Sequence, residues 1–232
     1  MISENVNEIR RRMDAAALRS GRNPEDIKLV AAVKSQGSPK IREAIKAGIK
    51  LIGHNYVQEA ASEKPMDCAA DVKFHMIGHV QRNKAKKAAE LFDVIETVDD
   101  IKLLEELDAA CSKLNKRLEL MVQVNLAGEV QKSGISENEA TRITQAALKF
   151  KNLKVIGLMT MPPFFDDPER ARPYFARLRN LRDKLIASGA LDPEAIELSM
   201  GMTGDFEAAI EEGATIVRIG TALFGPRLKP GA

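Results

Sequence analysis

A lysine follows the first strongly apolar run of the chain. Residues 29–33 are small or branched apolar residues, Lys34 comes next, and a polar, turn-prone segment occupies 35–39. Such a run is typical of a strand that is buried on both faces of a parallel sheet. Parallel sheets gather chemistry at the carboxyl ends of their strands, where an amine between apolar walls can form a Schiff base. The alternative is a lysine that merely ends the strand and faces water.

Two later segments carry residue types that suit the binding of a phosphate group. Ser199 and Gly201 follow one short apolar run, and Gly220 and Thr221 follow the next. Hydroxyl groups donate hydrogen bonds, and glycine lets a ligand approach the backbone N–H groups closely. In α/β barrels, the loops after the seventh and eighth strands often bind phosphate in this way. A pair of tight turns that contain glycine is the alternative interpretation.

An arginine interrupts the last apolar run. Arg218 stands between Val217 and Ile219, where a buried guanidinium is costly unless its donors are paired. Arginine has no acceptor, so a ring nitrogen that pairs with it must be unprotonated. The competing interpretation is an ion pair with a carboxylate of the protein.

The hydrophobic pattern predicts the elements that must position these residues. After a helix-like segment that covers roughly the first 20 residues, short apolar runs alternate with helical patterns. Asp99 and Asp100 begin one predicted helix, and residues 136–139 resemble a capping box for another. The predicted strands are 28–34, 49–53, 72–76, 93–96, 118–125, 154–159, 195–199 and 215–219, and the clearest predicted helices are 99–115, 136–150, 169–188 and 203–212.

This alternation predicts an α/β fold: a single (β/α)8 TIM-type barrel with an extra N-terminal helix against the barrel wall. We expect one domain over residues 1–232, because no linker, low-complexity segment or repeat interrupts the pattern. A doubly wound open sheet is compatible with the same alternation, but no GxGxxG motif follows the first strand. In a barrel, the polar residues at the strand ends would meet on one face.

Composition narrows the possible partners. The 232 residues are 44% hydrophobic and carry a formal net charge of +2, without a long block of like charge. These values give no support to a nucleic-acid or membrane-surface partner. The N-terminus lacks the apolar core of a signal peptide, and no apolar run reaches membrane-spanning length. We therefore expect a cytoplasmic protein. We also expect a monomer.

The cysteines and histidines do not predict a metal site. Cys68 and Cys111 lie in helix-like sequence without the spacing of a metal motif, so idle thiols are expected. His54, His75 and His79 do not share one helix at ligand spacing, which favours hydrogen bonding or packing over metal binding.

Six segments together resemble the pyridoxal phosphate homeostasis protein family, whose members are related to the barrel domain of alanine racemase. The resemblance implies pyridoxal 5'-phosphate (PLP) held as an internal aldimine on Lys34, with Arg218 facing the pyridine nitrogen. It also implies that Asn55 lies near the cofactor, that the loop 79–84 lies beside the pocket, and that Ser199, Gly201, Gly220 and Thr221 contact the phosphate. The matching segments are LVAAVKS, GHNYVQEA, FHMIGHVQRNK, VNLAGEVQKSG, GLMTMPP and LSMGMTGDFEAAIEEGATIVRIGTALFG.

The chain departs from the family pattern at two places. The family commonly has glutamate before the asparagine, where this chain has His54. The family also commonly has a second lysine shortly after the first, just before a proline. Here residues 35–38 stand between Lys34 and Pro39, without a second lysine. A role of that second lysine in loading or releasing the cofactor is therefore not expected in this chain.

The resemblance favours a protein that stores or delivers PLP over an enzyme. An arginine opposite the pyridine nitrogen weakens the ring as an electron sink, which disfavours catalysis. The recipients of the delivered PLP would be PLP-dependent apo-enzymes. Related racemases take a second acid/base group, a tyrosine, from a domain beyond the barrel. The chain ends at Ala232, so we expect that domain to be absent, and neither Tyr56 nor Tyr174 takes the place of the missing tyrosine.

Two other functions stay open at this point. One is a stand-alone PLP-dependent amino-acid racemase or lyase that uses Tyr56 or His79 as its second base. The other is a barrel that binds phosphosugars, in which Lys34 touches no cofactor.

Overall fold

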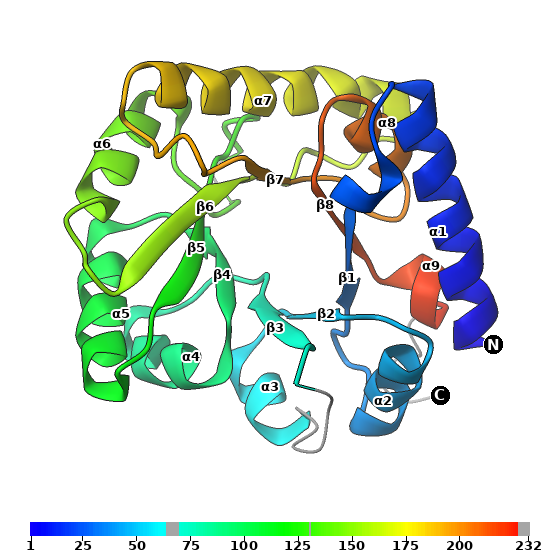
Figure 1. Cartoon of the computed structure of the whole chain (residues 1–232), viewed down its shortest axis with the longest axis horizontal. Helices are drawn as coiled ribbons and strands as arrows, with labels where there is room; N and C mark the ends of the chain where they lie inside the picture. Colours follow the sequence, from blue (N-terminus) through cyan, green and yellow to red (C-terminus); the bar gives the residue numbers. More distant parts are fainter. Residues whose placement is uncertain (64–69, 130, 227–232) are drawn as a thin grey trace.

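The strands close into a barrel. The computed structural model describes residues 1–63, 70–129 and 131–226. All strand pairs are parallel, and the order runs from β1 to β8 and back to β1 (Figure 1). The predicted eight-stranded barrel is confirmed and the open sheet is wrong. The strands are β1 (Lys28–Ala32), β2 (Leu51–His54), β3 (Lys73–Met76), β4 (Val94–Val98), β5 (Leu118–Gln123), β6 (Leu153–Met159), β7 (Glu197–Ser199) and β8 (Ile216–Ile219).

Helices surround the barrel (Figure 1). The α-helices are α1 (Ile2–Arg19), α2 (Ser38–Lys46), α3 (Val57–Glu63), α4 (Ala85–Leu91), α5 (Ile101–Leu114), α6 (Glu137–Ala147), α7 (Arg172–Ala187), α8 (Phe206–Glu211) and α9 (Thr221–Phe224). In the described residues, three short 3-10 helices lie in the connections: η1 (Pro24–Asp26), η2 (Arg82–Lys84) and η3 (Pro168–Ala171). No helix of the described residues is long and apolar enough to cross a membrane.

The N-terminal helix covers the wall beside β8, as the sequence predicts. Val6, Ile9 and Met13 recur at helical spacing and are buried, so α1 presents one apolar face to the barrel. Figure 1 shows α1 lying alongside α8 and α9, and the Asn5 amide donates a hydrogen bond to the Leu223 carbonyl at 2.9 Å. The last strand therefore takes part of its cover from the beginning of the chain.

Local signals set several helix starts. The Asp100 carboxylate accepts from the Lys102 N–H at the start of α5, and Ser136 and Glu139 form the predicted capping box at the start of α6. Several predicted strand ends are displaced by one or two residues, and one of these matters for the site: β1 ends at Ala32, before Lys34. A turn closed by the Gln36 N–H on the Val33 carbonyl ends the strand.

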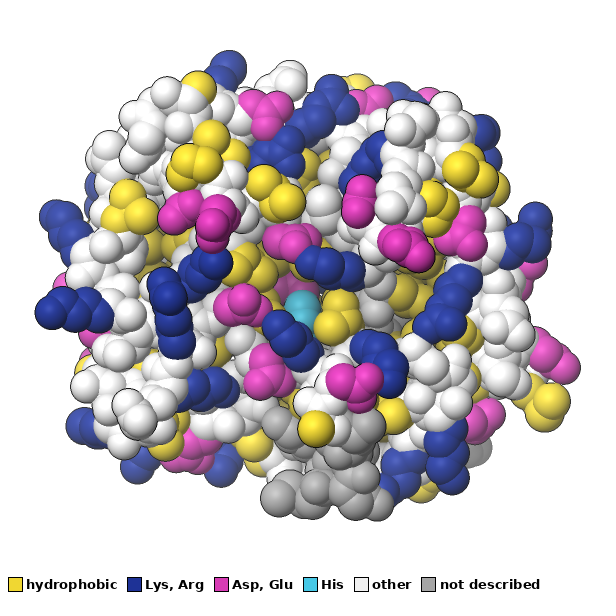
Figure 2. All heavy atoms as spheres, viewed as in Figure 1, with side chains coloured by type: hydrophobic (Ala, Val, Ile, Leu, Met, Phe, Trp, Pro, Cys, Tyr) yellow, Lys and Arg dark blue, Asp and Glu magenta, His cyan; other side chains and the backbone are white. Residues whose placement is uncertain are grey.

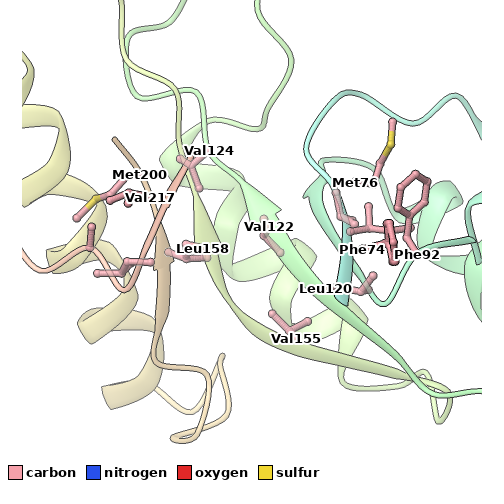
Figure 3. Packing of buried hydrophobic residues seen from close by; sticks show 14 of the residues in the cluster. Phe74, Met76, Phe92, Leu120, Val122, Val124, Val155, Leu158, Met200 and Val217 are labelled. Carbon is pink, nitrogen blue, oxygen red and sulfur yellow. The ribbon is translucent and has the colours of Figure 1, made fainter. Parts of the chain in front are cut away.

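Two apolar clusters form the core. One fills the barrel interior and contains Val30, Val94, Met159 and Ile216, which come from β1, β4, β6 and β8 and so from around the whole barrel. The other lies between strands and helices, and Figure 3 shows part of it. Cys111 belongs to this outer cluster as a free, buried thiol, whereas Cys68 lies outside the described residues.

Ion pairs lie at the amino ends of the strands. Lys28 of β1 pairs with Glu197 of β7, and Lys73 of β3 lies 3.3 Å from Glu119 of β5. Figure 2 shows basic and acidic side chains gathered over the centre of one face of the molecule. The carboxyl ends of the strands carry different chemistry.

Candidate functional site

A hollow at the carboxyl ends of the strands brings most of the predicted residues together. Its volume is about 260 Å³, and a smaller hollow of about 60 Å³ that contains Lys34 adjoins it. We call the two together the mouth cavity. They share Ala32, Asn55, Gly220 and Thr221. The walls come from the ends of β1, β2 and β8 and from the loops after β6 and β7. The larger hollow is also lined by Ile77, Met161, Phe164, Phe165, Met202, Thr203, Gly204, Asp205 and Arg218, and the smaller hollow by Lys34, Gln36, Phe224 and Gly225.

A larger hollow, of about 640 Å³, lies elsewhere. It runs between α1, η1 and the beginnings of β1 and β2, and it contains none of the predicted site residues. A choice by volume alone would place the functional site at the amino ends of the strands. In α/β barrels, however, the functional residues come from the loops that follow the strands.

Lys34 reaches the mouth cavity from the turn after β1. Its amine lies 5.2 Å from the centre of the Tyr56 ring and forms no ion pair with the described residues. The next residue, Ser35, adopts a left-handed backbone with φ of 58°, which is rare for a residue with a side chain. The turn thus holds a half-buried amine at the edge of the cavity without a competing carboxylate.

The loops after β7 and β8 supply unpaired donors on the far wall. Among the described residues, the main-chain N–H groups of Thr203 and Gly204 find no acceptor. Thr221 begins α9, so its N–H has no acceptor within that helix either. The Thr203 hydroxyl accepts only a long hydrogen bond, 3.4 Å, from the Ala222 N–H. This donor set fits the oxygens of a phosphate group.

Two predicted phosphate residues lie behind the cavity rather than on its wall. The Ser199 side chain is fully buried, and its hydroxyl donates to Glu96 at 2.6 Å. Gly201 has φ of +93°, and a Cβ there would lie 2.6 Å from the Ala209 Cβ. The glycine is therefore required by the approach of the loop to α8. Gly220 and Thr221, in contrast, line both parts of the cavity.

Arg218 lines the cavity from the barrel interior. Its Nη2 donates to the Thr160 carbonyl at 2.9 Å and its Nη1 donates to the Ser199 hydroxyl, while Glu96 Oε2 lies 3.9 Å away. Burial lowers the pKa of Arg218, and the charges of Glu96 and Asp205 oppose this shift. The competing interpretation, an ion pair with a carboxylate of the protein, thus holds for Glu96, and the same guanidinium also borders the cavity.

Asp205 stabilises the loop that carries Thr203 and Gly204. Its Oδ1 accepts from the Met202 N–H at 2.7 Å, and its own N–H donates to the Met202 carbonyl. Burial raises the pKa of Asp205, against the hydrogen bond from Met202 and the charge of Arg218. The Asp205 carboxylate shapes the loop but would itself repel an anion. An anionic ligand would therefore have to bind to the N–H groups of the neighbouring residues, Thr203 and Gly204.

Other residues from the sequence analysis lie away from the cavity wall. His54, which replaces the common glutamate, is fully buried and stacks on Phe74 at 6.3 Å between ring centres. His79 is half-exposed, and its Nδ1 lies 3.6 Å from Asp99. Tyr56 is half-exposed beside Lys34 without lining the cavity. No group of His, Cys, Asp or Glu side chains within the described ranges is arranged to hold a metal ion.

Sequence reasoning missed two kinds of site residue. Thr203 and Gly204 form a hydroxyl–glycine pair just before α8, a signal that was available in the sequence. Glu96 gives no such signal, because it lies inside a strand between Ile95 and Thr97 and contacts residues that are distant along the chain.

Fold and site together define a class: a closed parallel barrel with a lysine after β1, an arginine in β8, and unpaired N–H donors in the loop after β7. The family described as "Alanine racemase, N-terminal domain" matches residues 2–228. The pyridoxal phosphate homeostasis protein of Aquifex aeolicus is 39% identical over 224 residues, which cover 97% of each chain. The chain belongs to the pyridoxal phosphate homeostasis protein family.

Solved structures agree with this family. A protein of unknown function from Bifidobacterium adolescentis has a TM-score of 0.88 and 36% identity over 96% of this chain and 94% of that chain. PipY of Synechococcus elongatus, solved with PLP bound, has a TM-score of 0.82 and 33% identity over 97% of this chain and 100% of that chain.

Proposed function

We propose that this protein binds PLP in the mouth cavity and stores or delivers it, and so maintains the supply of vitamin B6. One observation carries the proposal: the hollow that contains Lys34 shares four wall residues with the hollow that contains Arg218 and the unpaired N–H groups of Thr203 and Gly204. An amine, a donor-only cation and a phosphate-type loop thus surround one space. The name of the Aquifex relative and the PLP in PipY support this proposal.

Each part of the cavity takes one part of the cofactor. Thr203, Gly204, Gly220 and Thr221 hold the phosphate, because their hydroxyl and N–H groups are the free donors there. Arg218 would face the ring nitrogen and Asn55 would lie beside the ring. The Lys34 amine would condense with the aldehyde, with loss of its oxygen as water. When bound, PLP supplies an electrophilic carbon and an electron-accepting ring, and the protein decides how far either is used.

The wall residues favour storage over turnover. Racemisation requires proton exchange on both faces of the substrate carbon, so a second acid/base group must stand opposite the lysine. Besides Lys34 and Arg218, Asp205 is the only ionisable side chain in the described part of the wall, and its carboxylate is bound to the loop backbone. Tyr56 and His79 do not line the cavity. Arg218 cannot protonate the ring nitrogen, which further limits carbanion formation.

Borohydride trapping tests the covalent assignment. The protein is incubated with PLP, reduced and digested, and the peptide that carries the added mass is identified by mass spectrometry. We expect the mass on Lys34 and its loss in Lys34→Ala, while Lys46→Ala, which changes an exposed lysine of α2, keeps it. If Lys34→Ala still carried the added mass, to the same extent as the wild type but on another lysine, the assignment to Lys34 would be wrong.

Product analysis tests the choice between carrier and enzyme. PLP-loaded protein is incubated with L- and D-alanine, serine and lysine, and the products are separated by chiral chromatography. We expect negligible conversion, together with activation of a PLP-dependent apo-enzyme added to the loaded protein. Robust racemisation, deamination or decarboxylation that disappears in Lys34→Ala would overturn storage and establish a PLP-dependent enzyme.

A further inference from the structure

A chain of buried polar side chains crosses the inside of the barrel and ends at the mouth cavity. His75 of β3, Glu96 of β4, Ser199 of β7 and Arg218 of β8 are each at most 4% exposed. The His75 Nδ1 lies 2.6 Å from Glu96 Oε1, and Glu96 Oε2 accepts from the Ser199 hydroxyl at 2.6 Å. The same hydroxyl accepts from Arg218 Nη1. We call these residues the interior chain.

The hydrogen bonds of the interior chain have one consistent direction. Arginine only donates, so the Ser199 oxygen accepts from it and the single hydroxyl hydrogen is directed at Glu96. Burial raises the pKa of Glu96, but the hydrogen bond and charge of His75, the charge of Arg218 and the Ser199 hydroxyl together hold the pKa below its ordinary value. Glu96 is therefore an ionised acceptor, and His75 donates from Nδ1.

Two carboxylates act on Arg218 from different sides. Glu96 lies inside the barrel, whereas Asp205 lies in the loop that forms the cavity wall. Both charges stabilise the guanidinium, but only Glu96 is within 4 Å of it and connected to it through Ser199. If the charge of Glu96 were removed, Asp205 would remain as the carboxylate that attracts Arg218, so the guanidinium could shift from its present contacts with Thr160 and Ser199.

We propose that Glu96 is a positioning residue for Arg218 and that, through Ser199, it holds the guanidinium so that an N–H edge meets the ring nitrogen of the bound pyridine cofactor. The inference rests on the proposed binding of PLP. Two of the five N–H groups of Arg218 are used on the Thr160 carbonyl and the Ser199 hydroxyl, which leaves donors for a ligand acceptor.

A binding cycle with two ligands tests this role. The ligands are PLP and its 1-deaza analogue, in which a C–H replaces the ring nitrogen, and binding is measured by calorimetry. In the wild type, we expect PLP to bind more tightly than the analogue by about tenfold or more, as for one hydrogen bond from a charged donor. Glu96→Gln should lose most of this preference. Glu197→Gln, which removes a carboxylate that pairs with Lys28 at the other end of the barrel, should keep it.

The outcomes separate positioning from general support of the fold. If Glu96→Gln lowered the affinity for PLP and for the analogue by the same factor, so that the preference for PLP stayed intact, the proposal would be overturned. If the wild type binds neither ligand, the proposed function fails and the inference fails with it; if the wild type binds both equally, PLP binding stands and the placement of Arg218 is wrong.

A second variant and a ligand-free measurement guard against misfolding. Ser199→Ala removes the bridging hydroxyl but keeps the charge of Glu96, and it should lose part of the preference for PLP. In the protein without ligand, nitrogen NMR reports rotation of the Arg218 guanidinium, which should be slow in the wild type and faster in both variants. Slow rotation in all three proteins would contradict the proposal.

Discussion

Substitution of Gly201 by alanine separates packing from ligand binding in the loop after β7. The residue has φ of +93°, where a side chain is strained, and its added Cβ would lie 2.6 Å from the Ala209 Cβ and 3.0 Å from the Phe206 Cα. Both neighbours belong to α8, so the loop or the helix must move. The Gly201 carbonyl also accepts from the Arg218 N–H at 3.0 Å, which connects this movement to β8.

The expected cost follows from these two effects. Left-handed backbone costs an alanine about 1–2 kcal/mol, and inserting a methyl group into a close-packed contact costs about 1–3 kcal/mol more. We therefore expect Gly201→Ala to lower the free energy of unfolding by about 2–5 kcal/mol, out of a total of about 5–15 kcal/mol for a typical domain. Such a loss would be large enough to lower the denaturation midpoint clearly.

Equilibrium unfolding in urea without cofactor measures this loss. The matched control is Gly204→Ala in the same loop, where no atom lies within 4 Å of the added Cβ and the backbone is not left-handed. The control should change the free energy of unfolding by no more than about 1 kcal/mol. Wild-type stability in Gly201→Ala would refute the packing argument and return this glycine to the phosphate site.

Two further predictions concern the phosphate and the buried carboxylate. PLP should bind more tightly than pyridoxal by several kcal/mol, about 1.5–3 kcal/mol for each charge-assisted bond to the phosphate, and Thr203→Val should weaken PLP but not pyridoxal in calorimetry. Equal affinity for the two compounds would contradict the phosphate site. The pKa of Glu96 is lowered in the folded protein, because His75 and Arg218 outweigh the effect of burial. The ionised Glu96 therefore stabilises the fold above its ordinary pKa of 4.5, and this contribution is lost as the pH falls through the lower pKa of the folded state. Urea unfolding across this acid range should show a smaller loss of stability in Glu96→Gln, and an unchanged pH dependence would refute the ionised state of Glu96.

The sequence alone predicted the elements and the general position of the site, because their signals are local. Apolar runs marked all eight strands, and the capping residues at Asp100 and Ser136 marked helix starts within a few residues. Lys34, Gly220 and Thr221 were recognisable because residues after barrel strands converge on one face. The boundary of β1 was wrong because the turn at Ser35 depends on backbone geometry rather than on hydrophobicity.

Tertiary structure alone decided which partner each buried group has. The sequence indicated that Arg218 requires an acceptor, but Glu96 and Ser199, 103 positions apart, meet only because barrel closure brings the interior faces of β4, β7 and β8 together. The sequence also contained Ser199 and Gly201 in a phosphate-like pattern. Only the structure shows that the Ser199 hydroxyl donates to the buried Glu96 and that α8 packs closely against Gly201. A side chain's direction depends on strand register and on what packs behind it, and neither is encoded in the neighbouring residues.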